Sequence, residues 1–135
     1  MTGLPAWKLD HVDPARMKTL ALLLADPNPI HLDAAAARRL GVADGPVNQG
    51  PSTMAMAVNM VLAAFPGGRM ISFRSRLLGL VLAGDSVEGG GNVMDRKIVD
   101  GQERVRCQLH LDVPGRGRVL EAEAVLVWPA ADGNR

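Results

Sequence analysis

The sequence predicts an α+β fold in which a long antiparallel sheet wraps around one buried helix. Two observations lead to this class. Residues 51–65 are apolar on almost every side of a helix, which is typical of a helix enclosed by other elements. After residue 69 the chain changes to β-branched residues, alternating patterns and turn pairs, as expected for consecutive antiparallel strands. A sheet that curls around the helix would bury the apolar surfaces of both.

The first elements are shorter. Residues 5–12 alternate weakly between apolar and polar side chains, which suggests an opening strand. Asp13 followed by Pro14 is a favourable helix start, and residues 15–25 are strong helix formers. Because proline has no N–H, we expect this helix to end at Pro27.

A second short helix is expected within residues 33–41, with Asp33 as its N-cap and Gly41 as its stop. Residues 42–50 are dense in turn-forming residues and predict a loop. The loop leads directly into the apolar helix.

Four strands are predicted after that helix, at residues 70–82, 85–99, 102–113 and 117–128. The pair Asp100-Gly101 predicts a tight hairpin between the second and the third. The third alternates strictly, so one of its faces should be buried. That face carries Val105, Cys107, Leu109, Leu111 and Val113.

Length and composition limit the possible functions. The 135 residues suit a single domain over residues 1–135, large enough for a core without disulfides or a metal. With 15 Lys and Arg against 14 Asp and Glu, the net charge of +1 gives no general attraction to nucleic acid or to an anionic membrane. The absence of Tyr leaves few rings for stacking on bases. We therefore expect no nucleic-acid partner.

The expected location is the cytoplasm, away from membranes. The single cysteine, Cys107, cannot form an internal disulfide, and the first residues lack the basic and then apolar pattern of a signal peptide. The longest apolar runs are shorter than the roughly 20 residues that a membrane span requires.

The stretch "DPNPIH" is the best candidate for chemistry. In a regular helix or strand, Asp26 and His31 would point in different directions. Pro27 and Pro29 prevent regular structure, and Asn28 between them favours a turn. A tight bend would therefore bring a carboxylate and an imidazole together.

A carboxylate and an imidazole held close can divide proton transfer between them, which suits the addition or removal of water. The same pattern fits a plainer alternative, in which Asp26 caps a turn and His31 only precedes the next helix. A metal site built from Asp26, His31 and Asp33 is weakly supported, because no HExxH motif or cysteine pair is present. We therefore expect no metal.

These residues resemble a known family. The stretch "ADPNPIHLDAAAARRLG", with its DxNPxH core, is similar to the hydratase signature of the MaoC-like, (R)-specific enoyl-CoA hydratases. The match continues through "GPVNQGPSTM", the apolar helix and "LVLAGDSV". The resemblance implies a hot-dog fold, in which a long antiparallel sheet wraps a central helix, and a homodimer in which two sheets become continuous.

The resemblance also implies an activity: reversible hydration of trans-2-enoyl thioesters, or dehydration of (R)-3-hydroxyacyl thioesters. The acyl group would be carried on coenzyme A or on a phosphopantetheine carrier, without a further cofactor. Possible partners are an acyl carrier protein and a second hot-dog chain.

Site residues follow from the same resemblance. Asp26 and His31 would be the catalytic pair. The N–H of Gly50 would bind the thioester carbonyl, as a free N–H at a helix start is able to do. Asn28, Gln49 and Ser52 would support the site.

Two departures from the family pattern leave alternatives open. Gln49 stands where the family usually has a histidine, and Val58 lies where a small hydroxyl residue is common. The chain could instead be a non-catalytic hot-dog subunit that completes a partner's active site. A hot-dog acyl thioesterase is a further alternative, although the DxNPxH turn argues against it.

Other candidates have plainer interpretations. Arg74 and Arg76 could contact a coenzyme A phosphate or an acidic carrier protein, or simply lie on a solvated strand face. Cys107 is expected to be a packed thiol rather than a nucleophile. The glycines at 89–91 are expected to form a bulge or bend, because no helix follows them to cradle a phosphate.

Overall fold

The computed structural model describes residues 2–129. Its strands are β1 (Thr2–Gly3), β2 (Trp7–Leu9), β3 (Arg69–Leu77), β4 (Val87–Val99), β5 (Gln102–Val113) and β6 (Gly117–Pro129). Its helices are α1 (Pro14–Leu23), the 3-10 helix η1 (Pro29–His31), α2 (Ala34–Arg39) and α3 (Gly50–Ala64). The α+β class is confirmed.

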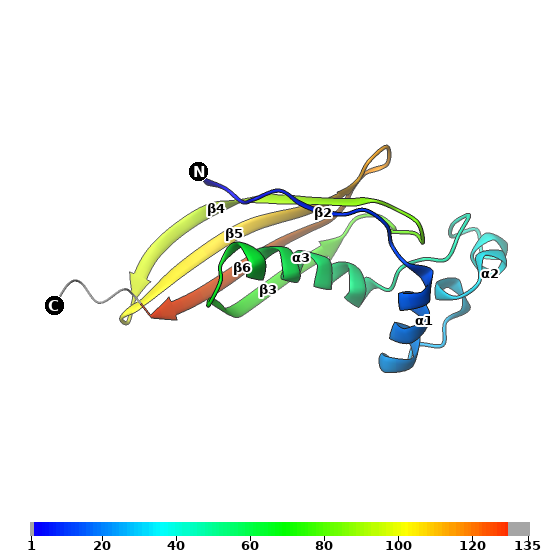
Figure 1. The fold of residues 1–135 in the computed structure, drawn as a ribbon, viewed down its shortest axis with the longest axis horizontal. Helices are drawn as coiled ribbons and strands as arrows, with labels where there is room; N and C mark the ends of the chain where they lie inside the picture. Colours follow the sequence, from blue (N-terminus) through cyan, green and yellow to red (C-terminus); the bar gives the residue numbers. More distant parts are fainter. Residues whose placement is uncertain (1, 130–135) are drawn as a thin grey trace.

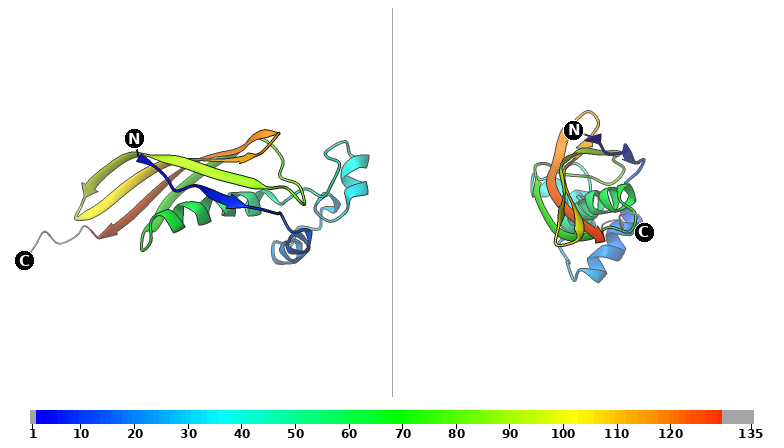
Figure 2. Two further views of the ribbon diagram at one scale, coloured as in Figure 1. Left: turned by 45° about the horizontal axis from the view of Figure 1, so that its top comes forward. Right: turned by 90° about the vertical axis from the view of Figure 1, so that its left-hand side faces the viewer.

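The strands form one antiparallel sheet in the order β1-β4-β5-β6-β3, and β2 also pairs with β4. Figure 1 shows α3 along the concave side of this sheet, and the end-on view in Figure 2 shows the sheet curling around it. The helices α1, η1 and α2 lie beyond one end of the sheet. We call residues 14–39 the arm.

The core lies between α3 and the inner face of the sheet. The predicted alternation of β5 is confirmed, since every second side chain of this strand is buried. On the helix side, the buried apolar residues are Met56, Ala57, Met60 and Val61. Ala57 is fully buried, and its small side chain allows the sheet to approach the helix closely.

Burial of α3 on all sides was also predicted, and this is wrong for part of its surface. Ala55, Asn59, Leu62 and Ala63 are exposed. The reason is geometrical, because a single curled sheet covers only one side of a helix. The helix also begins at Gly50 rather than at residue 51.

The first long strand is shorter than predicted. β3 ends at Leu77 rather than at residue 82, because the N–H groups of Leu78 and Gly79 both turn to the Val119 carbonyl. The chain then leaves the sheet and forms an isolated bridge between Leu82 and Val47. This departure brings residues 80–83 to the loop that precedes α3.

The glycine run lies inside β4 without a bulge of its own. A Cβ on Gly91 would lie 2.3 Å from the Gln108 carbonyl oxygen, so glycine is required there by the close approach of β5. The register shift of this strand pair falls later, between Val93 and Asp95. The prediction of a bulge at residues 89–91 is therefore wrong in position.

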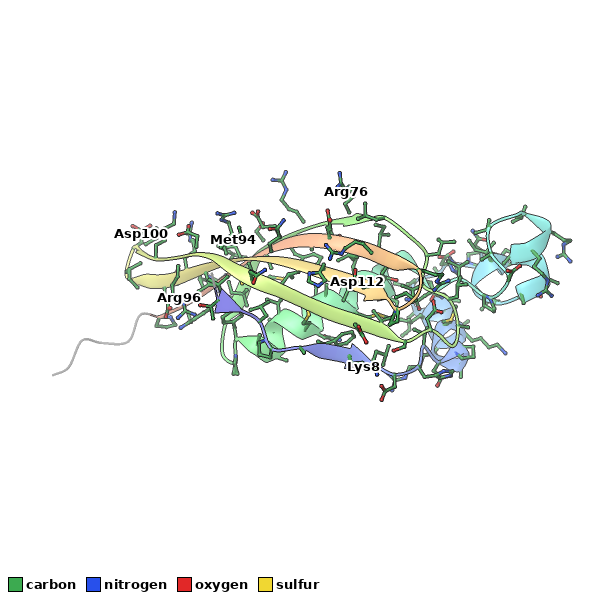
Figure 3. The ribbon with its side chains drawn as sticks, turned by 90° about the horizontal axis from the view of Figure 1, so that it is seen from above. Lys8, Arg76, Met94, Arg96, Asp100 and Asp112 are labelled. Carbon is green, nitrogen blue, oxygen red and sulfur yellow. The ribbon has the colours of Figure 1, made fainter. Side chains whose placement is uncertain are left out.

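The outer face of the sheet is charged (Figure 3). Arg76 forms an ion pair with Glu121 at 3.4 Å, and Arg74 lies opposite Glu123 in the strand register. Arg118 Nε donates to Asp112 Oδ1 at 2.8 Å. Within residues 2–129, no helix is long and apolar enough to cross a membrane.

Candidate active site

The end of α1 places the first site residue. Ala25 adopts a left-handed conformation with φ of 50°, and its N–H donates to the Leu22 carbonyl at 3.3 Å. The Asp26 N–H donates to the Ala21 carbonyl at 2.9 Å. Together these bonds form a Schellman motif, which satisfies the last carbonyls of the helix and reverses the chain. Helix α1 therefore stops before Pro27, and Asp26 is the first residue after the reversal.

The 3-10 helix η1 then returns the chain toward this carboxylate. Asn28 caps η1, because its Oδ1 accepts from the Ile30 N–H at 3.2 Å. The Asn28 N–H donates to Asp26 Oδ1 at 3.3 Å. The turn is thus built from local bonds of polar side chains to the backbone, as expected for this residue type. It brings His31 back to Asp26.

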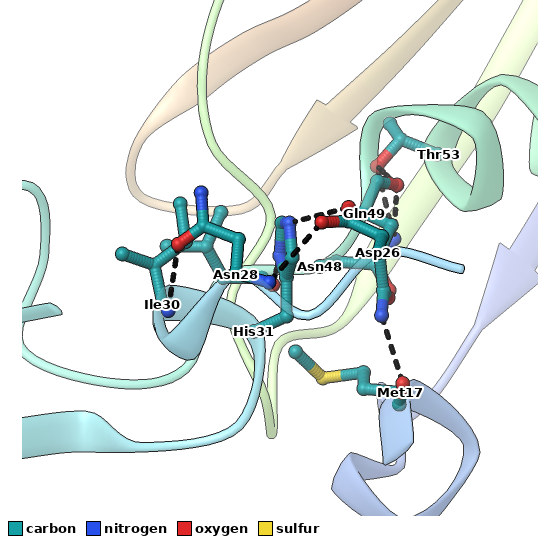
Figure 4. A network of polar contacts seen from close by, with 9 residues as sticks. Met17, Asp26, Asn28, Ile30, His31, Asn48, Gln49 and Thr53 are labelled. Atoms are coloured by element: carbon teal, nitrogen blue, oxygen red, sulfur yellow. Dashed lines mark hydrogen bonds and ion pairs between the residues drawn. The ribbon is translucent and has the colours of Figure 1, made fainter. Parts of the chain in front are cut away.

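The carboxylate and the imidazole meet directly (Figure 4). His31 Nε2 lies 3.1 Å from Asp26 Oδ2, and the two side chains are 10% and 37% exposed. His31 Nδ1 lies 2.7 Å from the Val47 carbonyl oxygen. A carbonyl oxygen only accepts, so Nδ1 carries a proton. Nε2 is then the ring nitrogen that faces Asp26 Oδ2.

The loop before α3 holds the Val47 carbonyl in place. The Val47 N–H donates to the Ile30 carbonyl at 2.8 Å, and the Asn48 N–H donates to the Val81 carbonyl at 2.7 Å. The loop is therefore bonded to η1 on one side and to the segment after β3 on the other. The orientation of His31 depends on both connections.

A cavity of about 500 Å³ opens beside the pair. His31 and Gly50 both line it, together with Val47, Asn48, Thr53 and residues 77–81. Gly50 is the first residue of α3, so its N–H has no acceptor within the helix, and none is found elsewhere in residues 2–129. A Cβ on Gly50 would come within 3.1 Å of Leu77 Cδ1. Gly50, which carries the free N–H, and His31 thus line the same cavity.

Asp26 lines a second, mostly apolar cavity on the arm, of about 620 Å³. Its other walls are Lys18, Ala21, Leu22, Ala25, Pro27 and Leu32. Asp26 therefore lines one cavity and His31 lines the other.

Gln49 joins the arm to the start of α3. Its side chain is fully buried, and Nε2 donates to the Met17 carbonyl of α1 at 2.8 Å. Because Met17 O only accepts, the amide cannot be flipped, and Oε1 is left buried without a hydrogen-bond partner. Gln49 makes no side-chain cap of α3.

Two polar residues of the cavity were missed by the sequence reasoning. Asn48 Nδ2 donates to Thr53 Oγ1 at 2.9 Å, and the hydroxyl of Thr53 donates to the Gln49 carbonyl at 3.5 Å. All three residues are buried. Their signal in the sequence was a polar cluster around the glycine that begins an otherwise apolar helix.

The structure does not bring every predicted residue to the site. Ser52 lines a different cavity, of about 690 Å³, between α1, β2 and the exposed side of α3. Asp33 caps α2 through a bond from the Ala35 N–H at 2.9 Å. The residues from 2 to 129 contain no group of three His, Cys, Asp or Glu side chains that could hold a metal.

The cysteine is unsuited to nucleophilic chemistry. Cys107 is fully buried in β5 on the core side of the sheet. Burial raises the pKa of the Cys107 thiol to about 11, and the nearby Arg96 lowers it by a smaller amount. At neutral pH the thiol is protonated, in agreement with the prediction of a packed side chain.

Residues 5–113 match the family model described as "MaoC like domain". No curated protein sequence is significantly similar to the chain. Among solved structures, the unliganded (R)-hydratase PhaJ1 of Pseudomonas aeruginosa is similar with a TM-score of 0.78, at 20% identity, over 100% of this chain and 90% of that one.

Two further similar structures come from Mycobacterium tuberculosis. The ChsH1-ChsH2 complex gives a TM-score of 0.77 at 22% identity, over 93% of this chain and 94% of that one. The C-terminally truncated HadBC complex, a 3R-hydroxyacyl-ACP dehydratase, gives a TM-score of 0.75 at 19% identity, over 94% of this chain and 96% of that one. At these identities the similarity establishes the fold, and the predicted hot-dog arrangement is confirmed.

Proposed function

Because the chain belongs to the MaoC-like domain family, we propose that it is a hydro-lyase that hydrates trans-2-enoyl thioesters and dehydrates (R)-3-hydroxyacyl thioesters. The observation that carries this proposal is the Asp26–His31 contact of 3.1 Å beside the cavity that Gly50 lines. Hydration needs a proton to leave water and a proton to reach the α-carbon. A carboxylate and an imidazole in contact are suited to divide these two transfers between them.

The thioester carbonyl would be bound at the start of α3. When water adds to the β-carbon, negative charge develops on the carbonyl oxygen of an enolate-like transition state. The free N–H of Gly50 and the positive end of the α3 dipole would stabilise that charge. This contribution is larger in the transition state than in the substrate, so it increases the rate.

The pair would complete the reaction without a net change in its own protonation. As the oxygen of water bonds to the β-carbon, the pair accepts a proton from that water. The pair would hold one proton at the start of the reaction, and that proton would go to the α-carbon. Dehydration is the same sequence in reverse. Water and substrate supply every atom, so the proposed reaction requires only the thioester carrier, coenzyme A or phosphopantetheine.

The supporting residues would act through geometry. Asn28 fixes the turn between the two members of the pair, and Gln49 fixes α1 against the start of α3. Gln49 does not titrate, so all proton transfer would fall to Asp26 and His31. Ser52, which lines a different cavity, has no place in this mechanism.

A second hot-dog chain would complete the cavity. β3 is the last strand of the sheet, and its outer edge is unpaired among the described strands. Leu77, Leu78 and Leu80 line the cavity yet are exposed, which indicates a surface for another chain. We propose a second copy of this chain at that edge. The alternative is a heterologous partner whose site this chain completes, since two similar structures are complexes of two named chains.

The test is the loss of enoyl-thioester absorbance with crotonyl-CoA and longer analogues. Asp26→Asn and His31→Ala should each lower kcat by roughly 10²–10⁴-fold. His110→Ala is the matched control, because that histidine lies on the outer face of the sheet beside Asp112. It should retain activity.

Three outcomes would contradict parts of the proposal. Unchanged activity in both site variants would show that the pair is not catalytic. Release of free thiol from saturated acyl-CoA would indicate a thioesterase. Activity that appears only with a different hot-dog chain would indicate the heterologous pair.

A further inference from the structure

Asp85, in the loop between β3 and β4, bonds to its own loop and to two other segments, although it does not line the cavity. Its Oδ2 accepts from the Leu82 N–H at 2.6 Å and from the Arg116 guanidinium of the β5–β6 hairpin. Its carbonyl accepts from the Val12 N–H, just before α1, at 2.9 Å. The carboxylate is 18% exposed. Hydrogen bonds to a charged carboxylate are stronger than bonds between neutral groups.

The same loop is bonded to the segment that orients the imidazole. The Ala83 N–H donates to the Pro46 carbonyl at 2.9 Å, and Leu82 pairs with Val47. On the other side of this pair, the Asn48 N–H donates to the Val81 carbonyl. Residues 81–83 and 46–48 therefore form a short ladder, and the Val47 carbonyl that accepts from His31 Nδ1 belongs to it.

The turn before Asp85 explains why the carboxylate is needed. Gly84 adopts a left-handed conformation with φ of 85°, and the Asp85 N–H donates to the Leu82 carbonyl at 3.1 Å. This turn points the Leu82 N–H back toward the loop. The Asp85 side chain satisfies that N–H and so closes the turn. Without it, the Leu82 N–H would lose its acceptor, and the position of Leu82 opposite Val47 would be less restrained.

We propose that Asp85 is a positioning residue for the Asp26–His31 pair, acting through the Leu82–Val47 ladder on the hydrogen bond that His31 Nδ1 donates. The inference rests on the proposed function for its effect on rate, and it deepens that function by adding a residue. Asp85 also sets the tautomer and orientation of the His31 ring, an effect that can be measured whether or not the protein is active. Arg116 holds the Asp85 carboxylate from the opposite side.

The matched control lies on the same hairpin. Arg118 and Asp112 also form a hydrogen-bonded ion pair, at 2.8 Å, but their contacts lie within β5 and β6 on the outer face of the sheet. Asp112→Ala therefore removes a comparable carboxylate without touching residues 81–83 or 46–48. The comparison separates positioning of His31 from a general contribution of surface ion pairs.

The experiment measures kcat and KM with crotonyl-CoA together with the imidazole ¹⁵N shifts of histidine-labelled protein. In Asp85→Ala, kcat should fall by about 10- to 100-fold with little change in KM, because the reacting groups and not the binding surfaces are displaced. The His31 ¹⁵N signals should show loss of the Nδ1–H tautomer. Asp85→Asn should recover part of both, since its Oδ1 still accepts from Leu82. Asp112→Ala should match the wild type.

The inference is overturned if Asp85→Ala leaves kcat and the His31 signals unchanged, or lowers only the free energy of unfolding. Should Asp85→Ala not fold, Arg116→Met is decisive, because it keeps the carboxylate and removes only its outer partner. Arg116→Met should move the His31 signals in the same direction, and unchanged signals would overturn the inference. A wild type inactive on every thioester would refute the proposed function, while the ¹⁵N signals would still decide the role of Asp85.

Discussion

The sheet and the turn after α1 are built in different ways. From Val105 to Val113 of β5 every second side chain is buried, and the backbone bonds between β5 and β6 form a long ladder with one register shift. In residues 24–33, single side chains satisfy the backbone: Asn28 caps η1, Asp33 caps α2, and Asp26 accepts from Asn28. Two large apolar side chains of this stretch, Leu24 and Leu32, are exposed.

This difference separates stability from chemistry. In the sheet, many side chains pack closely together, so a cavity left by a truncated side chain lowers the stability. This packing does not orient any particular polar group. The turn buries little, and each of its hydrogen bonds fixes the direction of one atom. A substitution in the sheet should therefore change stability more than rate, and a substitution in the turn should do the reverse.

The largest effect on stability is expected from Leu109→Ala in β5. Leu109 is almost completely buried against the core, so its truncation should lower the free energy of unfolding by about 2–5 kcal/mol. Urea unfolding measures this, and kcat per folded molecule should be retained. Ile98→Ala, at an exposed position of β4, is the control and should cost less than about 0.5 kcal/mol. Equal losses in both variants would contradict the assignment of the core.

The thiol of Cys107 tests burial in the same strand. With a pKa of about 11 the thiolate is scarce at pH 8, and alkylation should be at least about 100-fold slower than in the unfolded chain. The folded state favours the protonated thiol, because burial raises the pKa of Cys107 above that of the unfolded chain. The stabilisation that results is complete below the ordinary thiol pKa and is lost as the pH rises toward 11. Labelling with and without denaturant provides the comparison. Equal alkylation rates with and without denaturant would show that Cys107 is not buried in the folded protein.

In the turn, Asn28→Ala should change rate more than stability. Loss of the cap on η1 should cost about 1 kcal/mol of unfolding free energy. The displaced His31 should lower kcat by about tenfold or more. Asn28→Asp keeps an acceptor for the Ile30 N–H and should recover most of the rate. If kcat for crotonyl-CoA stays constant in Asn28→Ala, the turn does not depend on its cap.

The smallest effect is expected at Ala25, which adopts a left-handed conformation that favours glycine. Ala25→Gly should raise the free energy of unfolding by roughly 0.5 kcal/mol, because relief of strain exceeds the added chain entropy. Ala21→Gly, within α1, should instead lower it by about 1 kcal/mol. Thermal unfolding of both variants measures the two signs, and a loss in Ala25→Gly would contradict the Schellman end of α1.

Much of the site could be predicted because its turn is local. Two prolines and an asparagine restrict residues 26–31 whatever the rest of the chain does. The contact between Asp26 and His31 follows from that restriction and is found in the structure. Asp13 and Asp33 were recognised as helix caps for the same reason, since a cap depends on its nearest neighbours.

Other features depend on residues far apart in the chain. The proton on His31 Nδ1 is set by the Val47 carbonyl, 16 positions away, and Gln49 is bound by Met17 of the arm. No local pattern indicates either bond. The separation of Ser52 from the cavity was equally hidden, because neighbouring residues at a helix start point in different directions.

By itself, the sequence determined the α+β class, the buried face of β5 and the turn that joins Asp26 to His31, because periodicity, caps and proline act over short range. Tertiary structure alone decided where β3 leaves the sheet, which side of α3 stays exposed and which carbonyl orients the imidazole. These features follow from how the sheet curves and from which loops meet at its end. Packing between distant segments sets both, and the sequence pattern of one segment does not contain that information.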